Sequence, residues 1–150
     1  MPDASQQRYQ APSWFTTHVF NRLVRRATRL GISVWGSREL RIRGRKSGVL
    51  RSNVVNLLAH DGRRFLVAPR GETEWVRNLR AAGTGELRVG RRIETFASVE
   101  IDDAAKVDVL RAYLRRWKWE VGVFFQGVGP DAPDDDLARI APGYPVFEIR

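Results

Sequence analysis

The chain has 150 residues, a length that suits one domain, and its 43% hydrophobic and 29% charged residues indicate a globular protein. The absence of cysteine excludes disulfides, thiolate metal sites and cysteine nucleophiles, and two histidines are too few for a three-histidine metal site. We therefore expect no metal, and we expect any chemistry to belong to a bound cofactor.

The net charge of +9 is concentrated in one part of the chain. Residues 1–51 hold eleven basic and two acidic residues, whereas residues 52–150 hold fifteen of each. A solvated surface alone would mix the signs more evenly. The asymmetry favours an anionic partner, such as a phosphate, a polycarboxylate, a membrane surface or a nucleic acid.

The N-terminal segment is predicted to be a tail over residues 1–12, followed by a single domain over 13–150. A helix is expected over residues 13–30, in which the apolar side chains form one stripe. Its other positions include four arginines and no acidic residue. Residues 14–30 would suit an anionic membrane surface, and ordinary packing on the protein's own domain is the alternative. With no signal peptide and no long apolar run, we expect a cytoplasmic protein, at the inner face of the cell membrane if this helix binds there.

Short alternating or buried apolar segments predict the strands of an antiparallel sheet, and Asp61-Gly62 is a strong hairpin signal. The predicted strands are 39–43, 49–59, 63–69, 86–89, 93–101 and 145–149. Helices are expected over 72–82 and from Asp102 onward, and a solvated loop over 130–136. This order indicates a mainly β, α+β chain that folds as a small antiparallel barrel with helices on its surface.

The first candidate site is the turn Gly44-Arg45-Lys46-Ser47-Gly48 with the strand that follows it. Two glycines permit a tight turn with exposed amides, and the basic side chains add charge. Arg51 and Asn53 share one strand face because they lie two residues apart. The turn would bind phosphate or carboxylate oxygens, and a plain basic hairpin tip is the alternative reading.

Two aromatic features complete the candidate sites. Trp75 and Asn78, three residues apart on a helix, could stack on a flat heterocycle and bond its edge, or simply anchor the helix. A later cluster could wall a pocket for an apolar substrate, or pack as core. Its members are Tyr113, Trp117, Trp119, Phe124 and Phe125. Tyr113 and Tyr144 are the only further candidates for a proton donor, and no catalytic residue is certain.

Taken together, these segments resemble the deazaflavin (F420)-dependent nitroreductase family, in the split β-barrel flavin/deazaflavin oxidoreductase superfamily. The resemblance covers residues 38–149 and rests on GRKSG at 44–48, Arg51-Ser52-Asn53, the segment 65–71, Trp75-Val76-Arg77-Asn78 and the terminal strand. It implies an FMN-binding-protein-like split barrel. Val54 replaces a proline common in the family, and Pro69 replaces a small polar residue and removes a backbone donor.

What the resemblance implies about the site can be carried over position by position. The turn and the arginine after it would hold the cofactor phosphate, and the other positions would line the deazaflavin. The implied cofactor-binding residues are Arg45, Lys46, Ser47, Gly48, Arg51, Asn53, Val54, Ala68, Pro69, Arg70, Gly71, Trp75 and Asn78. The implied substrate residues are Tyr113, Trp117, Phe124 and Phe125.

The function that follows is hydride transfer from reduced F420 to an apolar, electron-poor acceptor such as a quinone, a nitroaromatic or an activated alkene. FMN is the alternative cofactor. A non-catalytic binding protein of the same fold, for flavin, fatty acid or anionic lipid, is the alternative function. A nucleic-acid partner is not expected, because no RNA- or DNA-binding motif appears. The protein would be a monomer or a homodimer.

Overall fold

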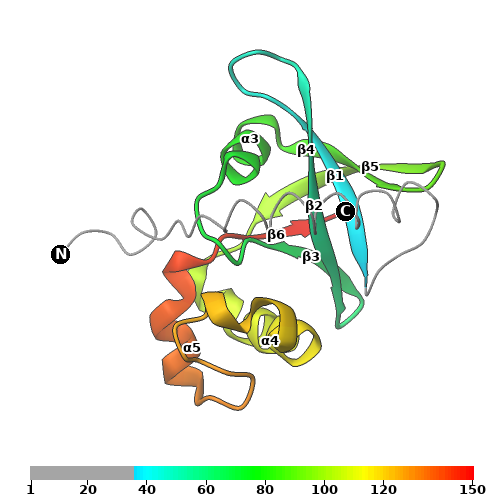
Figure 1. The fold of residues 1–150 in the computed structure, drawn as a ribbon. Helices are drawn as coiled ribbons and strands as arrows, with labels where there is room; N and C mark the ends of the chain where they lie inside the picture. The colour runs from blue at the N-terminus through cyan, green and yellow to red at the C-terminus, as the bar shows by residue number, and fades with distance from the viewer. Residues whose placement is uncertain (1–35) are drawn as a thin grey trace.

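A computed structural model describes residues 36–150, so the predicted tail and the basic helix over 13–30 lie outside the described residues. Six strands form a closed antiparallel barrel in the order β1-β2-β3-β6-β5-β4 within this part of the chain (Figure 1). The strands are β1 (Ser37–Arg43), β2 (Leu50–His60), β3 (Arg63–Val67), β4 (Thr84–Val89), β5 (Arg92–Glu100) and β6 (Val146–Ile149). The predicted barrel is confirmed.

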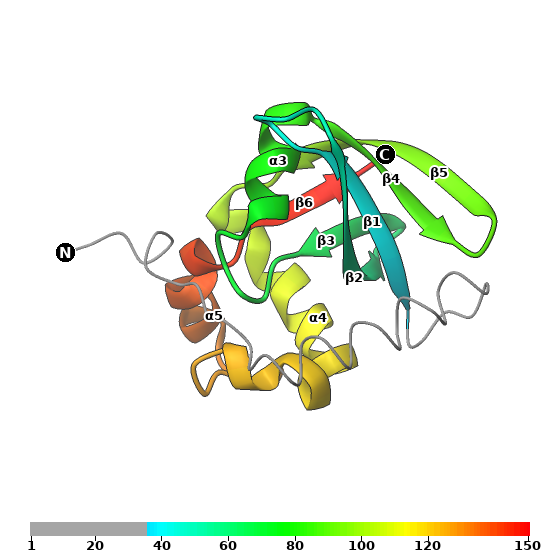
Figure 2. The ribbon, with the colours of Figure 1, turned by 45° about the horizontal axis from the view of Figure 1, so that its top comes forward.

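Three α-helices lie outside the strands in the described chain: α3 (Glu74–Ala82), α4 (Lys106–Val121) and α5 (Asp134–Ile140). Figures 1 and 2 show α3 beside the barrel, with α4 and α5 together on another side. Short 3₁₀ turns flank these helices: η1 (Asp103–Ala105), η2 (Gly122–Phe124) and η3 (Ala141–Gly143). No helix in residues 36–150 combines the length and apolarity needed to cross a membrane.

The hairpin between β2 and β3 forms as its sequence indicates. Asp61 and Gly62 have φ values of 51° and 72°, so both residues occupy the left-handed region. Two such residues make the turn whose twist matches the strands on either side. Gly adopts this conformation without a steric cost and Asp tolerates it better than most residues, which explains the Asp-Gly pair.

Strand β3 separates two hydrophobic cores, because successive side chains point to opposite faces of a sheet. Phe65 and Val67 pack with α4 and α5, whereas Leu66 and Ala68 face the barrel interior and α3. All four side chains are almost completely buried. The barrel core and the helical core are therefore distinct, and the sheet lies between them.

The structure corrects the prediction for residues 130–136. The last three of these residues, which are aspartates, do not belong to a solvated loop but form the first turn of α5. Carboxylates are favoured at a helix N-terminus because the helix dipole is positive there. Leu137 and Ile140, which follow, bury the helix against α4.

Candidate functional site

The turn between β1 and β2 is closed by its own hydrogen bonds. The Gly44 amide donates to Val49 O at 2.8 Å, and the Gly48 amide donates to Gly44 O at 2.9 Å. The Val49 amide donates to Ser47 Oγ at 3.1 Å. A Cβ at residue 44 would lie 2.9 Å from Ser47 Oγ, closer than real contacts permit. Glycine at 44 therefore allows this tight, fixed turn.

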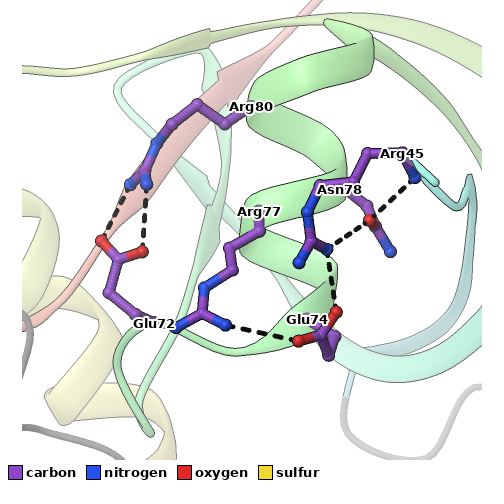
Figure 3. Close-up of polar contacts among 6 residues, drawn as sticks. All are labelled: Arg45, Glu72, Glu74, Arg77, Asn78 and Arg80. Carbon is purple, nitrogen blue, oxygen red and sulfur yellow. Dashed lines mark hydrogen bonds and ion pairs between the residues drawn. The ribbon is translucent and has the colours of Figure 1, made fainter.

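Helix α3 holds the turn through Asn78, which is 4% exposed. Its Oδ1 accepts hydrogen bonds from the Arg45 amide at 3.1 Å and from Arg45 Nη1 at 2.9 Å (Figure 3). Arg45 Nη1 also donates to Glu74 Oε2 at 2.8 Å. Asn78 was predicted to bond a heterocycle edge, but its carbonyl oxygen is committed to positioning the turn. Its amide nitrogen lies on the same side chain and still offers two donors.

Glu74 is a site residue that sequence reasoning missed. The hydrogen bond from Arg45 lowers the pKa of the Glu74 carboxyl below its ordinary value, and the charge of Arg45 adds to the effect. The carboxylate in turn offsets the charge of Arg45. An acid at the first position of a helix was visible in the sequence, but nothing there indicated that it would meet a turn 29 residues earlier.

The remaining positive charge of the turn comes from Lys46 and Arg51, which are both exposed. Within the described chain, no hydrogen bond occupies the backbone amides of Lys46 and Ser47. Two adjacent amides that lack a hydrogen bond, in a turn with two nearby cations, are suited to bind an anion. The charge that faces outward is thus that of Lys46 and Arg51 rather than of Arg45.

The predicted lining residues of β2 divide between the two faces of the strand. Arg51 and Asn53 have the same parity as Val55, which is buried in the barrel core. Val54 points to the opposite face because side chains alternate along a strand. Its side chain therefore does not share a face with Arg51 and Asn53.

The segment 68–71 connects β3 to α3 and lies at the barrel end. The Ala68 amide donates to Pro145 O at 2.9 Å, which extends the pairing of β3 with β6. Gly71 is buried with a φ of 86°, and Pro69 and Arg70 are half-buried. The positive φ at Gly71 turns the chain into α3, which brings this segment next to the helix that holds the 44–48 turn.

Trp75 packs in the barrel core. It is 8% exposed, and its ring centroid lies 6.1 Å from that of Phe147 on β6. This is the anchoring alternative that the sequence left open. A stacking role for Trp75 on a heterocycle stays a prediction, and 8% of the residue is exposed.

The far side of α3 is tied down by a second network (Figure 3). Arg80 donates to Glu72 at 3.0 Å and to Glu100 of β5 at 2.7 Å. These hydrogen bonds, first that with Glu100, raise the pKa of the Arg80 guanidinium above its ordinary value. Because both acids pair with Arg80, the loop before α3 and the helix itself are fixed against the barrel.

The predicted substrate cluster is mainly core. Tyr113, Trp117 and Phe125 are each at most 2% exposed and pack together with ring centroids 5.1 and 6.1 Å from Tyr113. Burial, and next the charge of Glu120, raise the pKa of the Tyr113 phenol well above its ordinary value. A higher pKa makes the phenol a weaker acid. Its role as proton donor stays a prediction, and the structure shows a core tyrosine.

Phe124 is the member of that cluster that reaches the predicted cofactor segment. Arg70 Cζ lies 5.4 Å from the centroid of the Phe124 ring, within the range of a cation–π contact. Tyr144, the other candidate donor, is fully buried and donates to Phe124 O. The predicted cofactor and substrate sets therefore meet at Arg70 and Phe124.

A cleft of about 450 Å³ opens elsewhere, on the outside of the barrel. None of the predicted site residues lines it. Its cations are Arg41 and Arg43 of β1 and Arg150. The alternation of Arg41 and Arg43 was visible in the sequence, but their proximity to residue 150 depends on the closure of the barrel.

The comparison with known families is consistent with this geometry. A family model described as F420H(2)-dependent quinone reductase matches residues 19–123, which is more than half of the chain. The chain belongs to the F420H2-dependent quinone reductase family. This family assignment supports an F420H2-dependent oxidoreductase and gives no support to FMN as the cofactor.

Solved structures show the same fold. A structure described as an F420-H2 dependent reductase (FDR-A) has a TM-score of 0.55 and 15% identity, over 77% of this chain and 94% of that chain. Another, described as a domain-swapped dimer, has a TM-score of 0.55 and 16% identity, over 93% and 100%. No curated protein matches the sequence. At such identities the structures establish the split-barrel fold alone.

Proposed function

We propose that this member of the quinone reductase family binds reduced F420 and uses it to reduce an apolar, electron-poor acceptor, with a quinone as the first candidate. The observation that supports the proposal most is the turn 44–48, which α3 fixes through Asn78. Nitroaromatics and activated alkenes are the other acceptors to test.

The residues of the turn fit the anionic part of such a cofactor. The free amides of Lys46 and Ser47 and the side chains of Lys46 and Arg51 offer a phosphate both hydrogen bonds and charge. Arg45 would act indirectly, since its guanidinium is paired with Glu74 and Asn78. A turn that is already ordered before the ligand binds loses little conformational freedom on binding, which favours affinity.

The residues of the barrel end fit the flat part of the cofactor. Asn53, the segment 68–71 and Trp75 would hold the ring system next to the turn. Arg70 and Phe124 would then border the acceptor side, because they are in contact with each other. The apolar side chains there would exclude water from the reacting atoms.

The chemistry supplied by the bound deazaflavin is a hydride. The protein has to position the acceptor, keep water out and hold the anionic groups. No nucleophilic side chain is required, in agreement with a chain that lacks cysteine. The proton that completes the reduction would come from solvent or from Tyr113 after an opening of the helical core.

The test is a fluorescence titration of the full chain with F420, with FMN in parallel. We expect saturable, preferential binding of F420, and a loss of at least tenfold in affinity for Lys46→Ala/Arg51→Ala. The matched control is Arg91→Ala, an exposed arginine at the β4–β5 turn. Unchanged affinity in the double variant would show that the anion cradle is misplaced.

Turnover is tested separately, by oxidation of F420H2 in the presence of a quinone. Oxidation that depends on the protein supports the enzyme. Tight F420 binding with no acceptor reduced would instead indicate a binding protein of the same fold. The membrane contact proposed for residues 14–30 is tested by measuring the partition of the full chain onto anionic vesicles. The variant for comparison has the four arginines of this segment changed to glutamine.

A further inference from the structure

Arginines gather at the end of the barrel that lies away from the turn 44–48. Figure 1 shows the β1–β2 turn at one end of the barrel and the β2–β3 turn at the other. On β1, Arg38 precedes the first residue of the turn by six positions, which corresponds to roughly 20 Å. Arg38 has the parity of Leu40, and Arg92 on β5 has that of Phe96. Leu40 and Phe96 are buried in the barrel core, so both arginines point to the inner face of the sheet.

The register of the sheet brings these two arginines into one row. Glu39, next to Arg38, pairs with Arg88 of β4. Val89, the next residue of β4, pairs with Arg92. Arg38 and Arg92 therefore lie on either side of β4, where the strands approach the β4–β5 turn.

Two further arginines reach the same end of the barrel. Arg64 of β3 has the parity of Leu66, which is buried in the barrel core, and donates to Glu94 of β5 at 3.0 Å. Arg116 extends from α4 to the start of β1, because a Cβ at Gly36 would lie only 3.4 Å from Arg116 Nη2. The arginine cluster, as we call this group, consists of Arg38, Arg64, Arg92 and Arg116, with Glu94 as its one acid.

The arginine cluster concentrates charge of one sign. Four arginines and one glutamate leave a net charge of +3, and within residues 36–150 neither Arg92 nor Arg116 forms an ion pair with an acid. Burial, and next the charge of Arg92, lower the pKa of the Arg38 guanidinium below its ordinary value. Arg116 and Arg64 add to this effect, and Glu94 opposes it. Like charges held this close repel one another, and a bound anion would offset that repulsion.

The chemistry of the cluster favours a phosphate monoester. Such a group carries between one and two negative charges at pH 7 and three acceptor oxygens, which arginine forks bind through paired hydrogen bonds. A carboxylate offers a single charge and two oxygens. Single-stranded nucleic acids bind through exposed aromatic side chains on which bases stack. The ring below Arg116 is that of Trp117, 4.9 Å from the guanidinium carbon, and it is fully buried.

We propose that the arginine cluster binds a phosphate monoester, with hydrogen bonds from Arg92 and Arg116 and with the charges of Arg38 and Arg64 adding to the attraction. The site lies at the opposite end of the barrel from the turn 44–48, and its occupation does not require the cofactor. The monoester belongs either to a soluble molecule or to a lipid headgroup, and the experiment distinguishes these sources.

The experiment is an NMR titration of the full, isotope-labelled chain with inorganic phosphate at constant ionic strength. Backbone amide and arginine side-chain signals report on the cluster. We expect saturable shifts at Arg92 and Arg116 with phosphate and none with chloride. Arg92→Gln should lower the affinity read at Arg116 at least fivefold. The matched control is Arg139→Gln, an exposed arginine on α5, which should change it less than twofold.

The variant Lys46→Ala/Arg51→Ala separates this site from the proposed cofactor site. It should leave the phosphate shifts at Arg92 and Arg116 unchanged, also if phosphate binds the turn 44–48. A chain that fails to bind F420 but shows these shifts supports the cluster and contradicts the proposed function. A chain that binds F420 but lacks these shifts does the reverse.

A second variant strengthens the site instead of weakening it. Glu94→Gln removes the one acid of the cluster and keeps an acceptor for Arg64, so phosphate should bind at least threefold more tightly. Glu94 is exposed, so the variant should fold. Weaker phosphate binding in Glu94→Gln, equal losses in Arg92→Gln and Arg139→Gln, or equal shifts with chloride would each overturn the proposal.

Vesicles identify the source of the monoester. Phosphatidic acid presents a phosphate monoester, and phosphatidylserine vesicles of equal charge are the control. A preference for phosphatidic acid that Arg92→Gln removes would assign the site to a lipid headgroup. Equal partition onto both vesicles, together with binding of inorganic phosphate, would assign it to a soluble monoester. Binding of a ten-residue oligothymidine at the cluster, tighter than that of phosphate, would overturn the proposal in favour of a nucleic acid.

Discussion

At the scale of single residues, one carboxamide oxygen joins two segments that are 33 residues apart. Asn78 Oδ1 accepts two hydrogen bonds from Arg45 and is itself buried. Asn78→Ala should release the turn 44–48 and lower F420 affinity at least tenfold. It should also cost about 1–3 kcal/mol of stability, because a partly buried donor loses its partner. Thermal unfolding and the F420 titration measure both effects.

The conservative variant Asn78→Asp provides the control for that prediction. Aspartate keeps an acceptor oxygen for Arg45, so the turn should stay in place and the stability lost in alanine should return. Its added negative charge lies beside the proposed anion site, so F420 affinity should stay below that of the unchanged chain. If alanine and aspartate lower the stability equally, the oxygen of Asn78 does not hold the turn.

Two glutamates should give stability opposite pH dependences. The hydrogen bond from Arg63 lowers the pKa of Glu148 below its ordinary value of 4.5, so its stabilisation is present above that pH and is lost on acidification. Burial raises the pKa of Glu120, so its contribution is favourable at low pH and is lost as the pH rises. Glu148→Gln should therefore flatten the acid limb of a plot of Tm against pH. Glu120→Gln should raise Tm at pH 7.

The two variants, Glu120→Gln and Glu148→Gln, serve as controls for each other. Glu120→Gln keeps an acceptor for Asn56, which bonds the carboxylate at 3.4 Å, so only the charge is removed. A drop in Tm at pH 7 for Glu120→Gln would contradict the prediction for Glu120. An acid limb that is unchanged in Glu148→Gln would contradict the prediction for Glu148.

At the scale of elements, the packing of β4 on β5 depends on one missing side chain. A Cβ at Gly85 would lie 2.8 Å from Phe96 Cζ and 3.2 Å from the backbone oxygen of Arg41. Gly85→Ala should therefore cost about 1–3 kcal/mol by overpacking, measured by denaturant unfolding. Gly129→Ala, where the nearest atom is the end of Lys118 at 3.8 Å, is the control and should be close to neutral. Equal stability of the two variants would contradict this packing.

Most of the strands and helices, but not all, could be predicted from the sequence. The hairpin at Asp61-Gly62 was predictable because its backbone requirement is local, and the strands were predictable from alternation. Helix α5 was missed because Asp134–Asp136 appeared to be a solvated run, while Leu137 and Ile140, whose burial defines the helix, follow them.

The candidate site was predictable only in part. The turn 44–48 was identified, but its partners Glu74 and Asn78 are distant in sequence, so the commitment of Arg45 could not be foreseen. For Trp75 and Tyr113, residue pattern alone favoured packing and left ligand contact open. The periodicity of a core face and that of a pocket wall are the same, and only the fold shows which side chains are buried.

At the scale of the whole molecule, two cores on opposite faces of the sheet should respond separately to mutation. Trp117 is fully buried in the helical core, away from α3. Trp117→Phe should lower stability by about 1–3 kcal/mol and leave F420 affinity unchanged within twofold. Denaturant unfolding and the F420 titration test this. A raised KM for the quinone with unaltered stability would instead place Trp117 at the acceptor.

The position of β6 in the barrel has a consequence for synthesis on the ribosome. β6 lies between β3 and β5, although it is the last strand along the chain. Until residues 146–149 leave the exit tunnel, β3 and β5 each present an edge without its neighbour, and unpaired edges promote association with other chains. The barrel thus closes only once β6 has emerged, and the nascent chain depends on protection of these two edges until then.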